Sequence, residues 1–175
     1  MPSAKTVVPP LVVMGVQGSG KSTSGRAIAE FLSLPFIDGD DLHPAANKDK
    51  MASGHPLTDA DREPWLEAIG QALAEGLARG ESTVIACSAL KRRYRDLIRS
   101  FAPGTRFVHL TGERTLIAER LTHRDHEYMP PTLLDSQFDT LEPLEADEAG
   151  IPVDINLTPA RIAQAVSEAL TAAGR

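Results

Sequence analysis

The chain has 175 residues, of which 24% are charged and 42% hydrophobic, as is typical of a single globular domain. Eighteen Lys and Arg against 24 Asp and Glu leave a net charge of −6, which argues against a general nucleic-acid or membrane binder, because such proteins are usually basic. The single cysteine, Cys87, excludes a disulfide framework within one chain and is expected to be a small buried hydrophobic residue, not a nucleophile. We therefore expect one domain over residues 1–175, without nucleic-acid or membrane partners. The N-terminus has no apolar signal region, which makes the cytoplasm the default location.

Short apolar runs alternate with longer amphipathic stretches along the chain. Residues 12–14 predict a buried strand, and residues 21–32 predict a helix. Phe31 on this helix and Trp65 on the long helix below are expected in the core. Residues 36–37 predict a second strand, and the turn-rich stretch 39–57 predicts a loop-rich insert. Thr58 predicts the N-cap of a long helix that ends at Arg79, before Gly80. The later predicted strands are 83–87, 106–110 and 151–155, and the later predicted helices are 91–100, 113–122 and one that begins at Thr158-Pro159.

This alternation of strands and helices is typical of an α/β protein. It predicts a parallel sheet with helices on both faces. In such sheets, ligands bind beyond the carboxyl ends of the strands, so polar residues that follow the predicted strands are candidates for a functional site.

A phosphate-binding loop, or P-loop, follows the first predicted strand. Its residues match G-x-x-x-x-G-K-[ST] in full and lie between a strand and a helix, the context that this motif requires. Glycines allow backbone N–H groups to turn toward a phosphate, and the helix N-terminus adds positive potential. We expect Lys21 at the β- and γ-phosphates of ATP and the Ser22 hydroxyl on Mg²⁺. The predicted nucleotide-binding residues are Gly15, Val16, Gln17, Gly18, Ser19, Gly20, Lys21 and Ser22.

The chain lacks two motifs that are typical of other classes of P-loop protein. Residues 47–50 do not form the N-K-x-D motif of GTPases, and the strand 83–87 ends without an acid. The acidic cluster instead follows the second predicted strand, at residues 38–41. We expect Asp38 to hold Mg²⁺ and Asp40 to accept the proton of an attacking hydroxyl. The alternative is a solvated acidic turn, since Asp and Gly favour turns.

Three basic groups are further candidates. Arg120 and Arg124 are four residues apart on one face of a predicted helix, where they are expected to clamp the adenine and the γ-phosphate. Four cations lie within residues 91–95, either to receive an anionic acceptor or to coat a helix. Arg62 is at the start of the long helix. An exposed basic helix face is the alternative for the arginine pair.

Several of these stretches resemble the bacterial-type gluconokinases. The resemblance runs from about Val12 to Ile155, and its most specific parts are Asp38-Gly39-Asp40-Asp41-Leu42-His43-Pro44 and Cys87-Ser88-Ala89-Leu90-Lys91. It implies ATP-dependent phosphorylation of the 6-hydroxyl of D-gluconate to give 6-phosphogluconate. It also implies a P-loop NTPase of the nucleoside-monophosphate-kinase-like, three-layer fold, with a five-stranded parallel sheet, a lid at residues 123–140 and a possible homodimer.

The acceptor implied by this resemblance agrees with the residue types available. A carboxylate calls for cations, and Arg62, Lys91 and Arg92 are candidates. The hydroxyls call for groups such as Asp40 and His43. The stretches that carry the resemblance add Lys50 and Ser88 to the predicted substrate-binding residues. The alternatives are a kinase of the same fold for shikimate or a nucleoside monophosphate, and a nucleotide-binding switch without catalysis.

Overall fold

The structure, a computed structural model, describes residues 8–122 and 131–173. Five strands are present: β1 (Leu11–Met14), β2 (Phe36–Asp38), β3 (Val84–Ala86), β4 (Arg106–Thr111) and β5 (Ile151–Asp154). The first helices are α1 (Lys21–Leu32), α2 (Ala45–Ala52), α3 (Asp59–Ala78) and α4 (Arg92–Phe101). They are followed by α5 (Arg114–Thr122), α6 (Pro131–Thr140) and α7 (Pro159–Ala173), and two 3₁₀ helices are η1 (Gly39–Leu42) and η2 (Ala146–Glu148).

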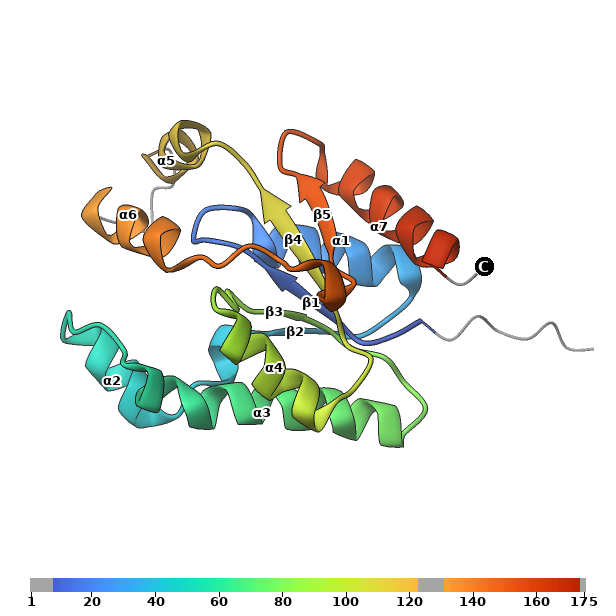
Figure 1. Ribbon diagram of the computed structural model, residues 1–175, viewed down its shortest axis with the longest axis horizontal. Helices are drawn as coiled ribbons and strands as arrows, with labels where there is room; N and C mark the ends of the chain where they lie inside the picture. The colour runs from blue at the N-terminus through green and yellow to red at the C-terminus, as the bar shows by residue number, and fades with distance from the viewer. Residues whose placement is uncertain (1–7, 123–130, 174–175) are drawn as a thin grey trace, which may run out of the picture.

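The strands form one parallel sheet in the order β2-β3-β1-β4-β5. The central strand β1 is buried along its whole length, as expected for a strand covered on both faces. Because all pairs are parallel, the carboxyl ends of the strands meet at one edge. The P-loop after β1 and η1 after β2 both begin at that edge, and the elements α2, α5 and α6 lie beyond it (Figure 1). The prediction of a five-stranded parallel sheet is confirmed.

Alternate residues of β1 point to opposite faces and divide the core into two clusters. Leu11 and Val13 belong to the cluster that α1 and α7 cover, where Ile28 is fully buried. Val12 and Met14 belong to the cluster covered by α3 and α4. The molecule thus has three layers, with α1 and α7 on one face of the sheet and α3 and α4 on the other (Figure 1).

The predicted strands and most predicted helices agree with the structure to within two residues, but three expectations were wrong. Residues 39–57 are not a plain loop, because they contain η1 and α2. The side chain of Asp38 accepts a hydrogen bond from the backbone of Asp40 and so caps η1. Residues 131–140 form a helix that the sequence pattern did not reveal. Phe31, expected in the core, is 55% exposed, because α1 is buried through the turns before it.

The capping of α3 was predicted correctly. The hydroxyl of Thr58 accepts from the Asp61 backbone at 3.1 Å, and the Asp61 carboxylate accepts from the Thr58 backbone at 2.8 Å. This reciprocal capping box satisfies two backbone donors and fixes where the helix begins. Arg62, a predicted substrate residue, and Trp65 lie in the first two turns of α3, so this cap also fixes their place in the fold.

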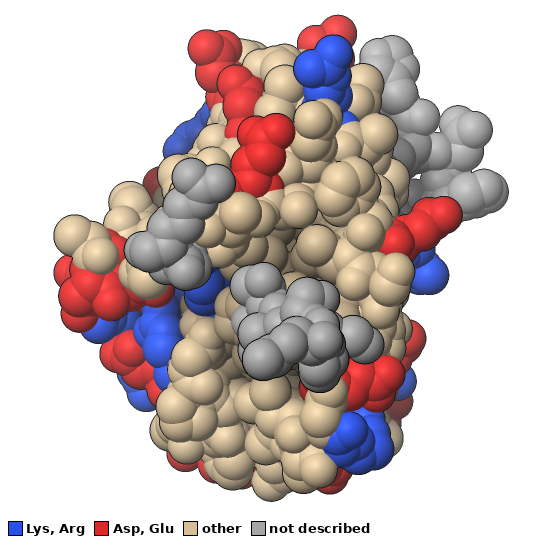
Figure 2. Space-filling model, turned by 90° about the vertical axis from the view of Figure 1, so that its right-hand side faces the viewer, with Lys and Arg blue, Asp and Glu red and all other residues tan. Residues whose placement is uncertain are grey.

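The surface opposite the P-loop carries charges of both signs. Figure 2 shows acidic and basic side chains interspersed along this face, with uncharged side chains over much of the area between them. The net charge of −6 is therefore not gathered into one acidic patch on this face. Among the helices that the structure describes, none is both long and apolar enough to cross a membrane.

A buried ion pair holds η2 against α4. The Arg95 guanidinium and the Glu148 carboxylate are both buried, and Arg95 Nε donates to Glu148 Oε1 at 2.7 Å. Arg99 donates to the same carboxylate at 2.5 Å. Arg95 also donates to the backbone oxygen of Ala89 at 3.0 Å. Ala89 has a φ of 45°, which is costly for a residue with a side chain, so this ion pair supports a strained turn next to the predicted substrate residue Ser88.

Replacement of Glu148 with glutamine should lower the free energy of unfolding by about 3 kcal/mol, because it leaves the buried Arg95 without a countercharge. Urea unfolding at pH 7 measures this change. The matched control is Glu81→Gln, since Glu81 is exposed and lies 3.9 Å from Arg79. The control should change stability by less than about 1 kcal/mol. Equal losses in the two variants would contradict a special role for the buried pair.

The stabilisation by the ion pair between Arg95 and Glu148 should depend on pH, because the Glu148 carboxylate can be protonated. Burial alone would raise the pKa of Glu148, but hydrogen bonds from Arg95 and Arg99 outweigh burial and lower the pKa from 4.5 to about 2. Because the pKa is lower in the folded state, the stabilisation is present above about pH 4.5 and is lost as the pH falls toward 2. The difference between the wild type and Glu148→Gln should therefore shrink over that range.

Candidate active site

The P-loop presents a helix N-terminus to its ligand. Gly20 is the N-cap of α1 and has a φ of 90°, a conformation that residues with side chains rarely adopt. No side chain caps this helix, and its first turn contains no acidic residue. The backbone donors of the first turn and the helix dipole are thus not neutralised by a side chain, which is the arrangement that binds phosphate.

Lys21 folds back over the loop. Its Nζ donates to the backbone oxygen of Val16 at 3.1 Å, and the hydroxyl of Ser19 donates to the same oxygen at 2.7 Å. The ammonium group is therefore held above the loop that begins at Gly15, where the phosphates of a nucleotide would lie. On the other side of the loop, the side chain of Leu121 packs on Gly18 so closely that a Cβ at Gly18 would lie 2.7 Å from Leu121 Cγ.

Asp38 connects the P-loop helix to η1. Its Oδ2 accepts from the Ser22 hydroxyl at 3.0 Å, and its Oδ1 accepts from the Asp40 backbone at 3.0 Å. Between the two acids, Gly39 passes so close to the sheet that a Cβ there would lie 2.3 Å from the backbone oxygen of Ala86. The structure thus brings together the two predicted metal ligands. Both are hard oxygen donors, and one or two such protein ligands suit Mg²⁺ bound together with phosphates and water.

The charges of three predicted site residues act on Cys87, the residue that follows β3. Burial raises the pKa of the Cys87 thiol to about 12, and the charges of Lys21, Asp40 and Arg62 act on the same group. Cys87 is accordingly a buried hydrophobic residue, as predicted. A P-loop lysine, a carboxylate and a guanidinium thus all influence one position at the carboxyl edge of the sheet electrostatically.

Arg62 has an unused hydrogen-bond donor. Its Nε is buried and has no hydrogen-bond partner in the part of the chain that the structure describes. Its guanidinium lies 5.7 Å from the centre of the Tyr94 ring, a cation–π distance. A buried polar atom without a partner is uncommon and costs free energy, so it points to a ligand that completes the site.

His43 and Trp65 build the wall beside Arg62. Their rings are stacked with centroids 4.0 Å apart, and Trp65 Nε1 donates to the backbone oxygen of Gly39 at 2.8 Å. Burial, then the charges of Arg62 and Lys48, lower the pKa of His43 to about 4. His43 is therefore neutral at pH 7, able both to donate and to accept a hydrogen bond. Trp65 was expected only to fill the core; it also anchors η1.

Other predicted substrate residues have carboxylate partners in the structure. Lys50 pairs with Asp61 at 2.6 Å, and Lys91 pairs with Asp59 at 3.3 Å. Arg92 forms ion pairs with Asp147, at 2.6 Å, and with Glu145. Ser88 accepts a hydrogen bond through its backbone oxygen from Gly15 at 3.3 Å, which places it directly beside the P-loop. Substrate contacts of these four residues stay predictions.

The predicted lid is only partly described. Arg124 lies outside the described residues. Arg120 is exposed on α5, and its guanidinium donates to the backbone oxygen of Ile155 at 2.9 Å. A residue that sequence reasoning missed is Gln137 on α6, whose side chain bonds the P-loop backbone at Gln17. The only sequence signal for Gln137 is its place in one of the stretches that resemble gluconokinases.

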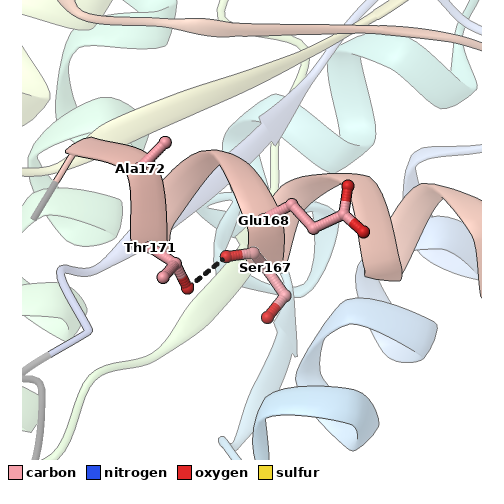
Figure 3. A pocket seen from close by; sticks show the side chains of 4 residues that line it. All are labelled: Ser167, Glu168, Thr171 and Ala172. Atoms are coloured by element: carbon pink, nitrogen blue, oxygen red, sulfur yellow. Dashed lines mark hydrogen bonds between the residues drawn. The ribbon is translucent and has the colours of Figure 1, made fainter.

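An open depression elsewhere on the surface has no part in this site. It is lined by four residues of one helix, α7: Ser167, Glu168, Thr171 and Ala172 (Figure 3). This end of α7 lies on the side of the molecule away from α2 and α6 (Figure 1). Because all four residues lie on one helix, their side chains do not surround a ligand from several directions.

The sequence and the fold of this chain are similar to those of known kinases. A family model described as shikimate kinase matches residues 17–170. The thermosensitive gluconokinase of Escherichia coli (strain K12) is 44% identical over 162 residues, which cover 92% of this chain and 87% of that protein. The gluconokinase of Gluconobacter oxydans (strain 621H) is 46% identical over 143 residues, covering 82% and 80% of the two chains. The crystal structure of a gluconokinase from Sinorhizobium meliloti 1021 has 46% sequence identity and a TM-score of 0.86, and covers 96% of this chain and 94% of that one.

The fold, the P-loop and the shikimate kinase model together define a P-loop kinase. Among P-loop kinases, the three gluconokinases named above identify the family, because each shares more than 40% identity with this chain over at least four fifths of its length. The chain belongs to the gluconokinase family. The resemblance seen in the sequence is thereby confirmed.

Proposed function

We propose that this kinase transfers the terminal phosphoryl group of ATP to the 6-hydroxyl of D-gluconate, giving 6-phospho-D-gluconate and ADP. Membership of the gluconokinase family supports this reaction. The observation that carries it is the buried Nε of Arg62, which has no hydrogen-bond partner among the described residues. A guanidinium in that place suits a carboxylate on the acceptor, because the two groups form strong charge-assisted hydrogen bonds.

In this proposal the acceptor lies along the wall formed by η1 and the start of α3. Arg62 binds the carboxylate of gluconate. The neutral ring of His43 and the side chain of Asn47 bind its hydroxyl groups, since both can hydrogen-bond without adding charge. Lys91, which lies 5.6 Å from the centre of the Tyr94 ring and is paired with Asp59, closes the carboxylate end of the pocket.

The nucleotide half uses the P-loop. Lys21 and the first backbone donors of α1 bind the β- and γ-phosphates. Ser22 and Asp38 are the residues that would hold Mg²⁺, which, when bound, neutralises charge on the phosphate oxygens. Arg120 is assigned to the adenine side, and Arg124 to the transferred phosphoryl group.

Asp40 is the general base of the proposed reaction. As the 6-oxygen of gluconate forms its bond to the γ-phosphorus, the hydroxyl proton passes to the Asp40 carboxylate. The bond between the γ-phosphorus and the bridging oxygen breaks, and that oxygen leaves as part of ADP. Little covalent chemistry is asked of the protein, so the rate depends on positioning and charge.

The direct test is ADP release by the purified protein with ATP, Mg²⁺ and one acceptor at a time. Gluconate, shikimate and AMP are the acceptors to compare, because shikimate is also a hydroxylated monocarboxylate that Arg62 would suit. We expect gluconate to give the highest kcat/KM and a product that reduces NADP⁺ with 6-phosphogluconate dehydrogenase. A rate that is the same with and without gluconate would refute the proposal, and a higher kcat/KM for shikimate would reassign the acceptor.

Replacement of Arg62 with glutamine should raise the KM for gluconate at least tenfold and change the KM for ATP less than about twofold, since a hydrogen bond to a charged group contributes roughly 1.5–3 kcal/mol. D-Gluconamide, which lacks the carboxylate charge, tests whether Arg62 binds that charge. The wild type should prefer gluconate to gluconamide, and Arg62→Gln should lose that preference. Arg79→Gln, at the exposed far end of α3, is the matched control. A larger effect on ATP than on gluconate would remove Arg62 from the acceptor pocket.

A further inference from the structure

One hydrogen bond joins the P-loop to a helix far along the chain. The backbone N–H of Gln17 donates to Gln137 Oε1 at 2.6 Å, across 120 residues of sequence. Gln17 is the third residue of the P-loop, and both residues are partly buried. This hydrogen bond satisfies a backbone donor of the loop and ties that part of the loop to α6.

The helix that carries Gln137 and the chain that follows it contact both core clusters and the start of α4. Leu134 on α6 is buried in the core, and Leu141 packs against both core clusters. Directly after it, the backbone N–H of Glu142 donates to the Leu90 oxygen at 2.7 Å, and Glu142 Oε1 accepts from the Arg92 backbone at 2.9 Å. The chain leaving α6 thus runs past the P-loop to the first turn of α4 (Figure 1).

These contacts place Gln137 between the two halves of the site. On one side its carboxamide holds the loop that binds ATP. On the other, five residues later, Glu142 holds the start of α4, next to Lys91. A carboxamide can accept this hydrogen bond without charge, whereas a carboxylate in the same place would repel the phosphates of ATP.

We propose that Gln137 is a positioning residue for phosphoryl transfer, which acts through Gln17 to hold the P-loop in register with the acceptor wall. This inference rests on the proposed function, because it assumes that the P-loop and that wall face each other across the transferred group. Loss of the contact should affect alignment, and so kcat, more than nucleotide binding, since a misplacement of about 1 Å can cost up to about 10²-fold in rate.

Two substitutions at Gln137 separate positioning from simple structural support. Gln137→Met keeps the length of the side chain and removes the acceptor oxygen. We expect kcat to fall about tenfold, with the KM for ATP changed less than twofold. Gln137→Glu keeps an acceptor for Gln17 but adds a negative charge. We expect the KM for ATP to rise about tenfold, with a smaller loss of kcat than in Gln137→Met.

Gln164→Met makes the same chemical change at an exposed position of α7 and serves as the control. The amide proton of Gln17, followed by ¹⁵N NMR, gives a readout independent of turnover. Loss of the 2.6 Å hydrogen bond should move its resonance upfield and speed its exchange in Gln137→Met but not in Gln164→Met. Three results would each overturn the inference. The kcat of Gln137→Met could stay within twofold of the wild type, or the Gln17 resonance could be unmoved in that variant. Both Gln137 variants could also lose kcat equally, with no change in the KM for ATP.

A wild type that is inactive with gluconate would instead refute the proposed reaction.

Discussion

Replacement of Lys21 with methionine should lower kcat/KM about 10³-fold while leaving the fold intact. The reason is the loss of a full positive charge at the point where charge shifts from the γ-phosphate to the leaving oxygen of ADP. In the structure the ammonium group is held over the loop by the Val16 oxygen at 3.1 Å, so its position does not depend on the nucleotide. Coupled ADP detection with gluconate measures the loss, and thermal unfolding checks the fold.

Arg79→Met provides the comparison for Lys21. It removes one cation from an exposed position at the C-terminal end of α3, where Arg79 is 3.9 Å from Glu81, and should leave kcat/KM within about twofold of the wild type. Activity in Lys21→Met within tenfold of the wild type would contradict the role of Lys21 in phosphate binding. Equal losses in the two variants would mean that net charge, and not the position of Lys21, is responsible.

Replacement of Asp40 with asparagine should lower kcat by roughly 10²–10³-fold, because a positioned general base contributes about 10²–10⁴-fold to such reactions. The affinity for nucleotide should change less than about threefold, since the P-loop and the Ser22–Asp38 pair stay in place. Single-turnover kinetics with gluconate measure the chemical step, and fluorescence titration with an ATP analogue measures binding.

Asp41→Asn is a closely matched control for Asp40. Asp41 is the next residue of the same 3₁₀ helix and is also exposed, so the two variants share any effect on η1 or on local charge. If kcat falls as much in Asp41→Asn as in Asp40→Asn, both losses come from the removal of a negative charge and not from the loss of a base. Equal loss of kcat and of nucleotide affinity in Asp40→Asn would count against its role as a base.

The parts of the fold that follow from local sequence were predictable. Strand β1, the P-loop and α1 are encoded within residues 11–32, where apolar burial, glycines and helix pattern agree. The N-cap at Thr58 is likewise a local signal. Helix α2 was missed because turn-forming residues surround its eight residues, so His43-Pro44 and Ser53-Gly54 outweighed the helix pattern.

Side-chain partners that are distant in sequence were beyond prediction. The cations of residues 91–95 were expected either to receive an anionic acceptor or to coat a helix. In the structure Lys91 pairs with Asp59 and Arg92 with Asp147, which are 32 and 55 residues away along the chain. The contact between Gln17 and Gln137 spans 120 residues. No periodicity within a single helix or strand reports such pairs, because they are created by the way the elements pack. Asp38 and Ser22 were predictable together because both lie at the carboxyl ends of strands of one parallel sheet, Asp38 as the last residue of β2 and Ser22 after the loop that follows β1.

The proposed acceptor wall comes almost wholly from one unbroken stretch of chain that leads from the end of β2 toward β3, from Asp38 to Trp65. Those two strands pair directly, with β2 at the edge of the sheet, whereas the P-loop follows the central strand. In evolution such a stretch can be lengthened, shortened or exchanged while the ATP-binding half keeps its sequence. A protein engineer can use the same division by grafting residues between β2 and β3 from another kinase of this architecture to change the acceptor, with the nucleotide requirement retained.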